Sequence, residues 1–146
     1  MHIYSTSVMQ FCKAIDMSAE ITARSGRDIG DLYGILTAEL GEPTTDRVEA
    51  HATPEQKSKL SSISAGQIEA LQLAGEKIEN VIDRAPGNNA AIGGIKVSTA
   101  SGWFAARPSG TEDIYKIYAE SFKDKAHLQS ILHEAQVIVD HALGTT

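Results

Sequence analysis

The sequence is poor in cysteine, in aromatic residues and in long apolar runs. Among its 146 residues, Cys12 is the single cysteine, and aromatic residues make up 5%. One cysteine excludes an internal disulfide, and no Cys-x-x-Cys pair indicates a zinc site. So few aromatic residues argue against a surface that stacks nucleic-acid bases. No apolar stretch approaches the ~20 residues that a membrane-spanning helix needs.

Positive charge is also scarce. The sequence has 13 Lys and Arg against 19 Asp and Glu, so its formal net charge is −6. Because no run is rich in Lys or Arg, we expect neither a nucleic-acid nor a membrane partner. The N-terminus lacks a basic region followed by a long apolar run, so we expect no signal peptide and a cytoplasmic protein.

The histidines do not show a metal-ligand pattern. His127, His133 and His141 fall on one expected helix, but at spacings of six and eight residues. Such spacings do not stack side chains on one helix face as i,i+4 ligands would. We therefore expect solvated surface histidines and no metal site.

The N-terminal third is expected to be helical. Residues 17–24 have helical apolar spacing, and a second apolar stripe runs over 29–40, with Asp28 as its cap and Gly41 and Pro43 as its stop. Residues 1–16 are left unassigned. We place a domain boundary here, with a helical segment over 1–43 and a separate domain over 44–146.

The domain over 44–146 is predicted to be α+β. We expect a short linker over 45–52, in which residues 47–50 can be extended. Two short capped helices over 54–61 and 64–73 should serve as scaffold, and a C-terminal helix should run from Asp124 to Gly144. Period-two alternation predicts strands at 77–82, 92–99, 103–107 and 114–122. Strands joined by short turns favour an antiparallel sheet, with the last helix covering one face.

The sequence is organised around a polar hinge between the last two strands, Arg107-Pro108-Ser109-Gly110-Thr111-Glu112-Asp113. Gly110 lets the backbone turn, and the hydroxyls of Ser109 and Thr111 can donate hydrogen bonds. The planar guanidinium of Arg107 fits two phosphate oxygens. Such a hinge can hold an anion, most plausibly a phosphate, although the same residues also make plain turns.

Lys116 favours the anion site over the plain turn. It interrupts an apolar strand, where a lysine is costly unless it reaches solvent or an anion. Arg107 and Lys116 would then meet a phosphate from two sides. The alternative is an edge-strand lysine that discourages aggregation.

The other polar and aromatic residues near the hinge carry weaker signals. We expect Glu112 or Asp113 to orient Arg107 or cap the turn rather than to catalyse. Trp103 is expected to be a core residue rather than a platform for a sugar. Gly93-Gly94 predicts a bulge or a tight approach of strands.

The chain resembles the C-terminal domain of the bacterial α-phosphoglucomutases, in the α-D-phosphohexomutase superfamily. The resemblance rests on Pro86-Gly87-Asn88, on residues 92–97 and on residues 102–118 with the hinge, and it extends from about Ala19 to the C-terminus. It implies a four-stranded, mainly antiparallel sheet with helices on one side. It also implies that residues 1–43 end the preceding, third domain.

The resemblance implies a function as well. Such enzymes interconvert glucose 1-phosphate and glucose 6-phosphate through a phosphoserine and Mg²⁺, and the last domain grips the phosphate that is not transferred. Arg107, Ser109, Gly110 and Thr111 would bind it, helped by Lys116. The serine, metal and sugar-specificity loops lie in earlier domains, so this chain would bind no Mg²⁺, carry no catalytic residue and depend on the remaining mutase domains. A free-standing module that binds a phosphosugar or a partner without catalysis is the alternative.

Overall fold

The structure, a computed structural model, describes residues 17–144 and separates into two compact units, divided between Gly41 and Glu42. In the first unit, residues 17–25 are helical and α2 spans Ile29–Leu40. The Asp28 carboxylate accepts a hydrogen bond from the Gly30 N–H and thereby caps α2, as predicted. The unassigned residues 1–16, with Cys12, lie outside the described residues.

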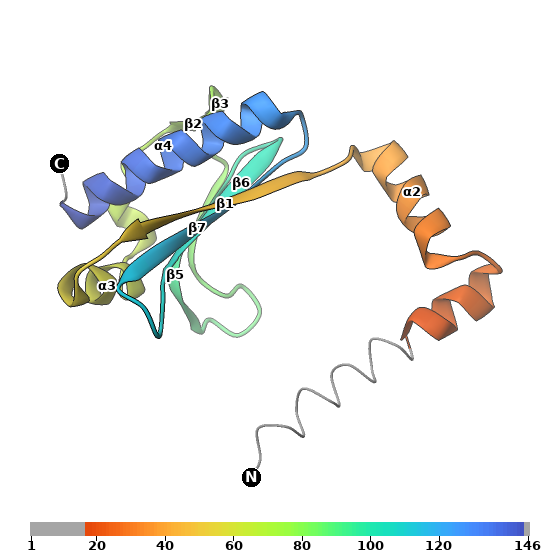
Figure 1. Cartoon of the computed structure of the whole chain (residues 1–146), viewed down its shortest axis with the longest axis horizontal. Coiled ribbons are helices and arrows are strands. Elements are labelled where there is room, and N and C mark those ends of the chain that lie inside the picture. The colour runs from red at the N-terminus through yellow and green to blue at the C-terminus, as the bar shows by residue number, and fades with distance from the viewer. Residues whose placement is uncertain (1–16, 145–146) are drawn as a thin grey trace, which may run out of the picture. The chain divides into compact units, whose positions relative to one another are not determined.

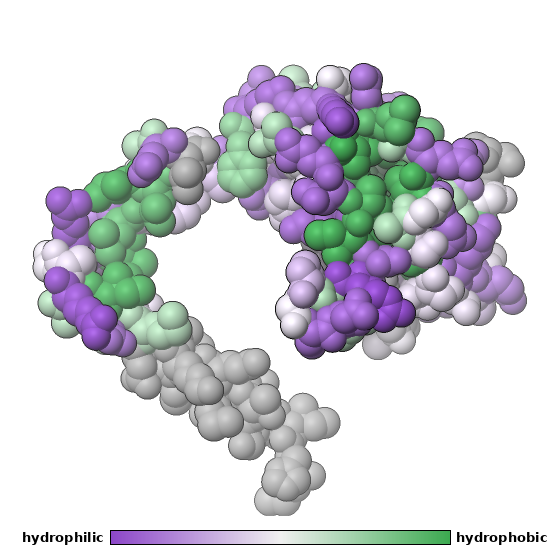
Figure 2. Space-filling view, turned by 180° about the vertical axis from the view of Figure 1, so that it is seen from behind, coloured by the Kyte–Doolittle hydropathy of each residue, from purple (hydrophilic) through white to green (hydrophobic). Residues whose placement is uncertain are grey.

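Apolar side chains lie exposed along the first unit. Figure 2 shows them gathered on the surface of its helices. They are Met17, Ile21, Ile29, Tyr33, Ile35 and Leu36, each exposed by 40% or more. A helix gains its stability in proteins chiefly by packing an apolar face, so this surface is suited to contact with another part of a protein.

The second unit is built on a five-stranded antiparallel sheet of order β1-β7-β6-β5-β4 (Figure 1). A short hairpin of β2 and β3 forms a separate sheet, and helices α3 and α4 complete the unit. The bounds are β1 Thr44–His51, α3 Pro54–Ser61, β2 Gln72–Leu73, β3 Glu76–Lys77, β4 Asn80–Arg84, β5 Ala91–Ser98, β6 Gly102–Pro108, β7 Ile114–Ser121 and α4 Lys125–Leu143.

The α+β class with an antiparallel sheet is confirmed, but the main sheet has five strands rather than four. The additional strand is β1, where a linker was expected over 45–52. β1 pairs along its whole length with β7, with Val48 opposite Ile117 and Glu49 opposite Lys116. Its mixed polar pattern is that of a strand with one buried face, because Val48 and Ala50 pack against the core.

Two further expectations are wrong. A second helix was predicted over 64–73, but only Ala65–Gln67 form a 3₁₀ turn before β2 begins. The Ser64–Gln67 capping box does form, so the start signal was correct, but no helix continues from it. His127 is not a solvated residue, because its Nδ1 lies 2.8 Å from the hydroxyl of the fully buried Ser121.

The two faces of the main sheet differ. Helices α3 and α4 pack on one, which we call the covered face, where Phe104 and Ile117 form one core cluster with Leu60 of α3 and Ile131 of α4. Alternate residues of the same strands point to the other, open face. They include Arg47, Glu49, Lys96, Trp103, Arg107, Lys116, Tyr118 and Glu120.

Trp103 lies on the open face, so the prediction that it belongs to the core is wrong. Its ring is half-buried and lies 4.3 Å from the Lys96 ammonium. The expected close approach at the double glycine is confirmed. A Cβ on Gly94 would lie 2.2 Å from the Ala106 carbonyl oxygen, so only glycine lets β5 approach β6 this closely.

Candidate functional site

A five-residue loop joins β6 to β7 and carries the central part of the predicted hinge. The loop is closed at its base, where the Ser109 N–H donates to the Ile114 carbonyl at 2.9 Å. Inside it, the Glu112 N–H donates to the Ser109 hydroxyl oxygen at 3.3 Å. Gly110 and Thr111 form the exposed tip. These bonds give the loop a defined shape without a ligand.

The hydrogen bonds at Ser109 decide which of its groups can meet an anion. Its backbone N–H is used inside the loop, so it does not donate outward. Its hydroxyl oxygen accepts from Glu112 through a lone pair. A hydroxyl has one proton to donate as well as two lone pairs, so the proton of Ser109 stays available for a phosphate oxygen.

The two predicted cations are cross-strand partners. Arg107 at the end of β6 lies opposite Lys116 on β7, and both project to the open face. The Arg107 guanidinium lies over the Tyr118 ring, 5.5 Å from its centroid, and Nη2 is 3.5 Å from the phenol oxygen. This hydrogen bond lowers the pKa of Tyr118. Arg107 itself is exposed, so a ligand can reach it.

Lys116 is held between two carboxylates. Its ammonium lies 3.3 Å from Glu49 on β1 and 3.4 Å from Glu112 in the loop. The hydrogen bond to Glu49 contributes most to raising the pKa of Lys116, so this lysine stays charged. The edge-strand alternative for Lys116 is wrong, because β7 lies between β1 and β6.

Lys57 of α3 reaches the loop from the covered face. Its ammonium donates to the Glu112 carbonyl oxygen at 2.6 Å and lies 3.5 Å from the Asp113 carboxylate. Sequence reasoning treated α3 as scaffold and missed Lys57, and it also missed Glu49. Neither residue belongs to a local motif. Only the pairing of β1 with β7 and the docking of α3 bring them to the loop.

Each loop carboxylate contacts a lysine. Glu112 contacts Lys116 and Asp113 contacts Lys57, so neither orients Arg107, which was one of the two roles expected of them. Glu49 also lies 3.7 Å from Arg47 on β1, so three carboxylates at the loop stand against four cations. They are Glu49, Glu112 and Asp113 against Arg47, Lys57, Arg107 and Lys116. The formal charges nearly balance, so an anion there would be held by short-range hydrogen bonds rather than by a large excess of positive charge.

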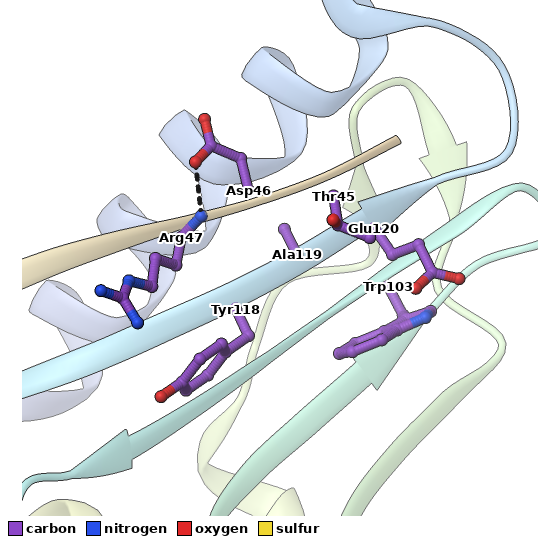
Figure 3. A pocket seen from close by; sticks show the side chains of 7 residues that line it. All are labelled: Thr45, Asp46, Arg47, Trp103, Tyr118, Ala119 and Glu120. Carbon is purple, nitrogen blue, oxygen red and sulfur yellow. Dashed lines mark hydrogen bonds between the residues drawn. The ribbon is translucent and has the colours of Figure 1, made fainter. Parts of the chain in front are cut away.

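A hollow of about 330 Å³ lies on the open face, along the strands from the loop (Figure 3). Trp103 and Tyr118 project into it from neighbouring strands, with Arg47 and Glu120 beside them, whereas Asp46 points to the other side of the sheet. Aromatic residues with a few polar groups suit either a ligand or a protein surface. The hollow adjoins the Arg107–Tyr118 contact without including the loop.

Within residues 17–144, no group of three or more His, Cys, Asp or Glu side chains lies close enough together to hold a metal ion. None of the helices described there is long and apolar enough to cross a membrane.

Comparison with known proteins covers the residues that build the loop. The family described as phosphoglucomutase/phosphomannomutase, C-terminal domain, matches residues 55–136, which include the β6–β7 loop and most of α3 and α4. A protein named phosphoglucomutase from Komagataeibacter xylinus is 57% identical over 120 residues. That match covers 82% of this chain but 22% of the relative, so the chain spans about a fifth of that protein's length. The chain belongs to the phosphoglucomutase/phosphomannomutase family, through its C-terminal domain.

Proposed function

We propose that this chain is the phosphate-clamping domain of a phosphoglucomutase that interconverts glucose 1-phosphate and glucose 6-phosphate. Arg107, Lys116 and residues 109–111 bind the phosphate that is not being transferred. The observation that carries this proposal is the β6–β7 loop, whose exposed tip lies beside Arg107 and Lys116 on adjacent strands. The name of the Komagataeibacter relative supports the choice of reaction.

The clamp binds through the groups described above. The Arg107 guanidinium takes two phosphate oxygens, the Ser109 and Thr111 hydroxyls donate to the others, and Gly110 lets the backbone approach closely. Lys116 adds a charge next to them. A site that reads only phosphate also accepts a sugar phosphate in either orientation, which the interconversion requires. Binding energy from the phosphate that is not transferred then holds the sugar in position for the reaction at its other end.

The chemistry itself belongs to other parts of the proposed enzyme. Phosphoryl transfer needs a phosphate carrier, a metal ion and groups that stabilise the transferred phosphate. We assign the phosphoserine and the Mg²⁺ ligands to the preceding domains of a cytoplasmic enzyme and no catalytic residue to this chain. The exposed apolar residues on α2 support a contact of the first unit with those domains.

The test is an amide chemical-shift titration of the chain with inorganic phosphate, glucose 6-phosphate and glucose. We expect both phosphates to shift residues 109–111 and glucose to shift none of them. Arg107→Ala removes a charged hydrogen-bond donor worth about 1.5–3 kcal/mol, so phosphate should bind about ten- to a hundredfold more weakly.

The matched control is Lys96→Met. Lys96 is a cation on the same open face, but its ammonium lies 4.3 Å from the Trp103 ring, outside the loop, so its loss should leave the phosphate affinity within twofold. Equal losses in the two variants would show nonspecific attraction to the open face. No movement of residues 109–111 in the unmodified chain would contradict the proposal.

A further inference from the structure

Lys57 is tied to the candidate phosphate loop from outside it. It lies on α3, more than fifty residues from the loop in sequence, and its ammonium donates to the Glu112 carbonyl at 2.6 Å. Its side chain is 21% exposed, although the exposed Glu112 leaves the contact itself open to solvent. A hydrogen bond from a charged donor is about twice as strong as one between neutral groups.

The local sequence explains why Lys57 points at the loop. Thr53 and Gln56 form a complete capping box and Pro54 occupies the first turn, so the start of α3 is fixed. Leu60 is fully buried against the sheet, and Lys57 lies three residues earlier, on the same side of the helix. The apolar stem of Lys57 therefore follows the covered face and brings its ammonium to the loop.

The contact fixes the direction of one peptide group. In a trans peptide, the C=O and the following N–H point in opposite directions. Because Lys57 binds the Glu112 carbonyl, the Asp113 N–H is turned away from α3. The Glu112 N–H is fixed by Ser109, and the Asp113 carbonyl accepts from the Ala52 N–H at 3.0 Å. Lys57 thus completes a series of contacts that orients consecutive peptides of the loop.

We propose that Lys57 is a positioning residue, which keeps the β6–β7 loop in its phosphate-binding conformation by holding the Glu112 carbonyl. This inference rests on the proposed function of the loop. Lys57 acts through the backbone and does not contact the phosphate. Without the Lys57 contact, the loop samples other conformations. The measured affinity for phosphate then falls in proportion to the fraction of molecules whose loop keeps the binding conformation.

The test is Lys57→Met, which keeps an apolar stem and removes the ammonium. If about 10–30% of the loops stay competent, inorganic phosphate binds about three- to tenfold more weakly. The amide signals of Glu112 and Asp113 should move in the ligand-free variant. The unfolding midpoint should change little, because the buried residues of α3 are kept. Lys57→Arg, which retains a donor at this position, should recover most of the affinity.

Two controls separate this role from simpler ones. Lys59→Met removes an exposed lysine from the same helix and should leave the phosphate affinity unchanged. Asp113→Asn breaks the 3.5 Å ion pair but keeps the hydrogen bond to the Glu112 carbonyl, so it too should retain the affinity. If Asp113→Asn weakens binding as much as Lys57→Met does, the ion pair holds the loop and the proposal is wrong.

The titrations also distinguish a failure of this inference from a failure of the clamp. The role of Lys57 alone would be overturned if the unmodified chain bound phosphate, Arg107→Ala lost this binding and Lys57→Met kept it. An unmodified chain that binds no phosphate at its loop would overturn both. Lys57 would have a purely structural role if Lys57→Met lost phosphate affinity and had a lower unfolding midpoint, and if Lys57→Arg did not restore the affinity.

Discussion

The two faces of the main sheet use the same strands for opposite purposes. On β6, Phe104 points to the covered face and is fully buried, while Trp103 and Arg107 of the same strand point to the open face. The covered face is apolar and holds the fold together. The open face carries paired charges and aromatic rings and leads to the loop. Residues of one strand can therefore be expected to separate into those that set stability and those that set binding.

The sharpest test of this division is Phe104→Ala. Removing a large side chain from a packed core leaves a cavity, so we expect a loss of about 3–5 kcal/mol in the free energy of unfolding. Trp103→Ala, one residue away on the open face, should cost about 1–2 kcal/mol, because the Trp103 side chain is only half-buried and less apolar area loses contact. Urea unfolding measures both. A cost for Trp103→Ala that equals the cost for Phe104→Ala would refute the division.

The β2–β3 hairpin, beside the covered face, should make stability depend on acid. The Glu76 carboxylate lies 2.5 Å from the Lys123 ammonium and also accepts from the Ser101 N–H. Lys123 contributes most to lowering the pKa of Glu76 from 4.5 to about 2. A carboxyl whose pKa is lower in the folded state stabilises it above the unfolded pKa, and this stabilisation is lost as the pH falls.

We therefore expect the free energy of unfolding of the unmodified chain to fall by about 1 kcal/mol through Glu76 as the pH drops from 4.5 to about 2. The value is modest because the Glu76–Lys123 pair is partly exposed to solvent. Glu76→Gln should lack this part of the pH dependence. Thermal unfolding of the two proteins over that range is the measurement. Parallel pH profiles would show that the contact with Lys123 contributes nothing to folding.

The open face should show a smaller effect, and in binding rather than in stability. Glu49 competes with a phosphate for Lys116, so Glu49→Gln removes a repulsion and we expect about two- to fivefold tighter phosphate binding at low salt. Glu120→Gln, on the same face beside Trp103, is the control and should change nothing. If Glu49→Gln weakened binding instead, Glu49 would be needed to hold Lys116 in place.

Local patterns predicted the elements that local physics determines. The alternation of β5, β6 and β7, the Asp124 cap and the Gly144 stop of α4, and the capping box of α3 were all readable from the sequence. β1 was not, because its polar residues become a strand only by pairing with β7, nearly seventy residues later. The helix expected over 64–73 failed because a correct start signal does not set a helix's length.

In the candidate site, too, only the residues that belong to a local motif could be predicted. The hinge placed Arg107 and Lys116 on adjacent strands, and the structure makes them cross-strand partners. Glu49 and Lys57 escaped notice because an isolated charged residue on a strand or helix carries no local signal. Their positions depend on strand register and helix docking. The binding role of the hinge residues stays a prediction until the titration is made.

The near balance of charge at the loop has a consequence for the rate of association. A site with excess positive charge draws anions from a distance, and its association rate falls steeply with added salt. Around this loop three carboxylates offset all but one of four cations, so we expect the association rate of phosphate to depend only weakly on salt. In the proposed clamp, phosphate would arrive without strong electrostatic steering and be held by the contacts of the loop itself.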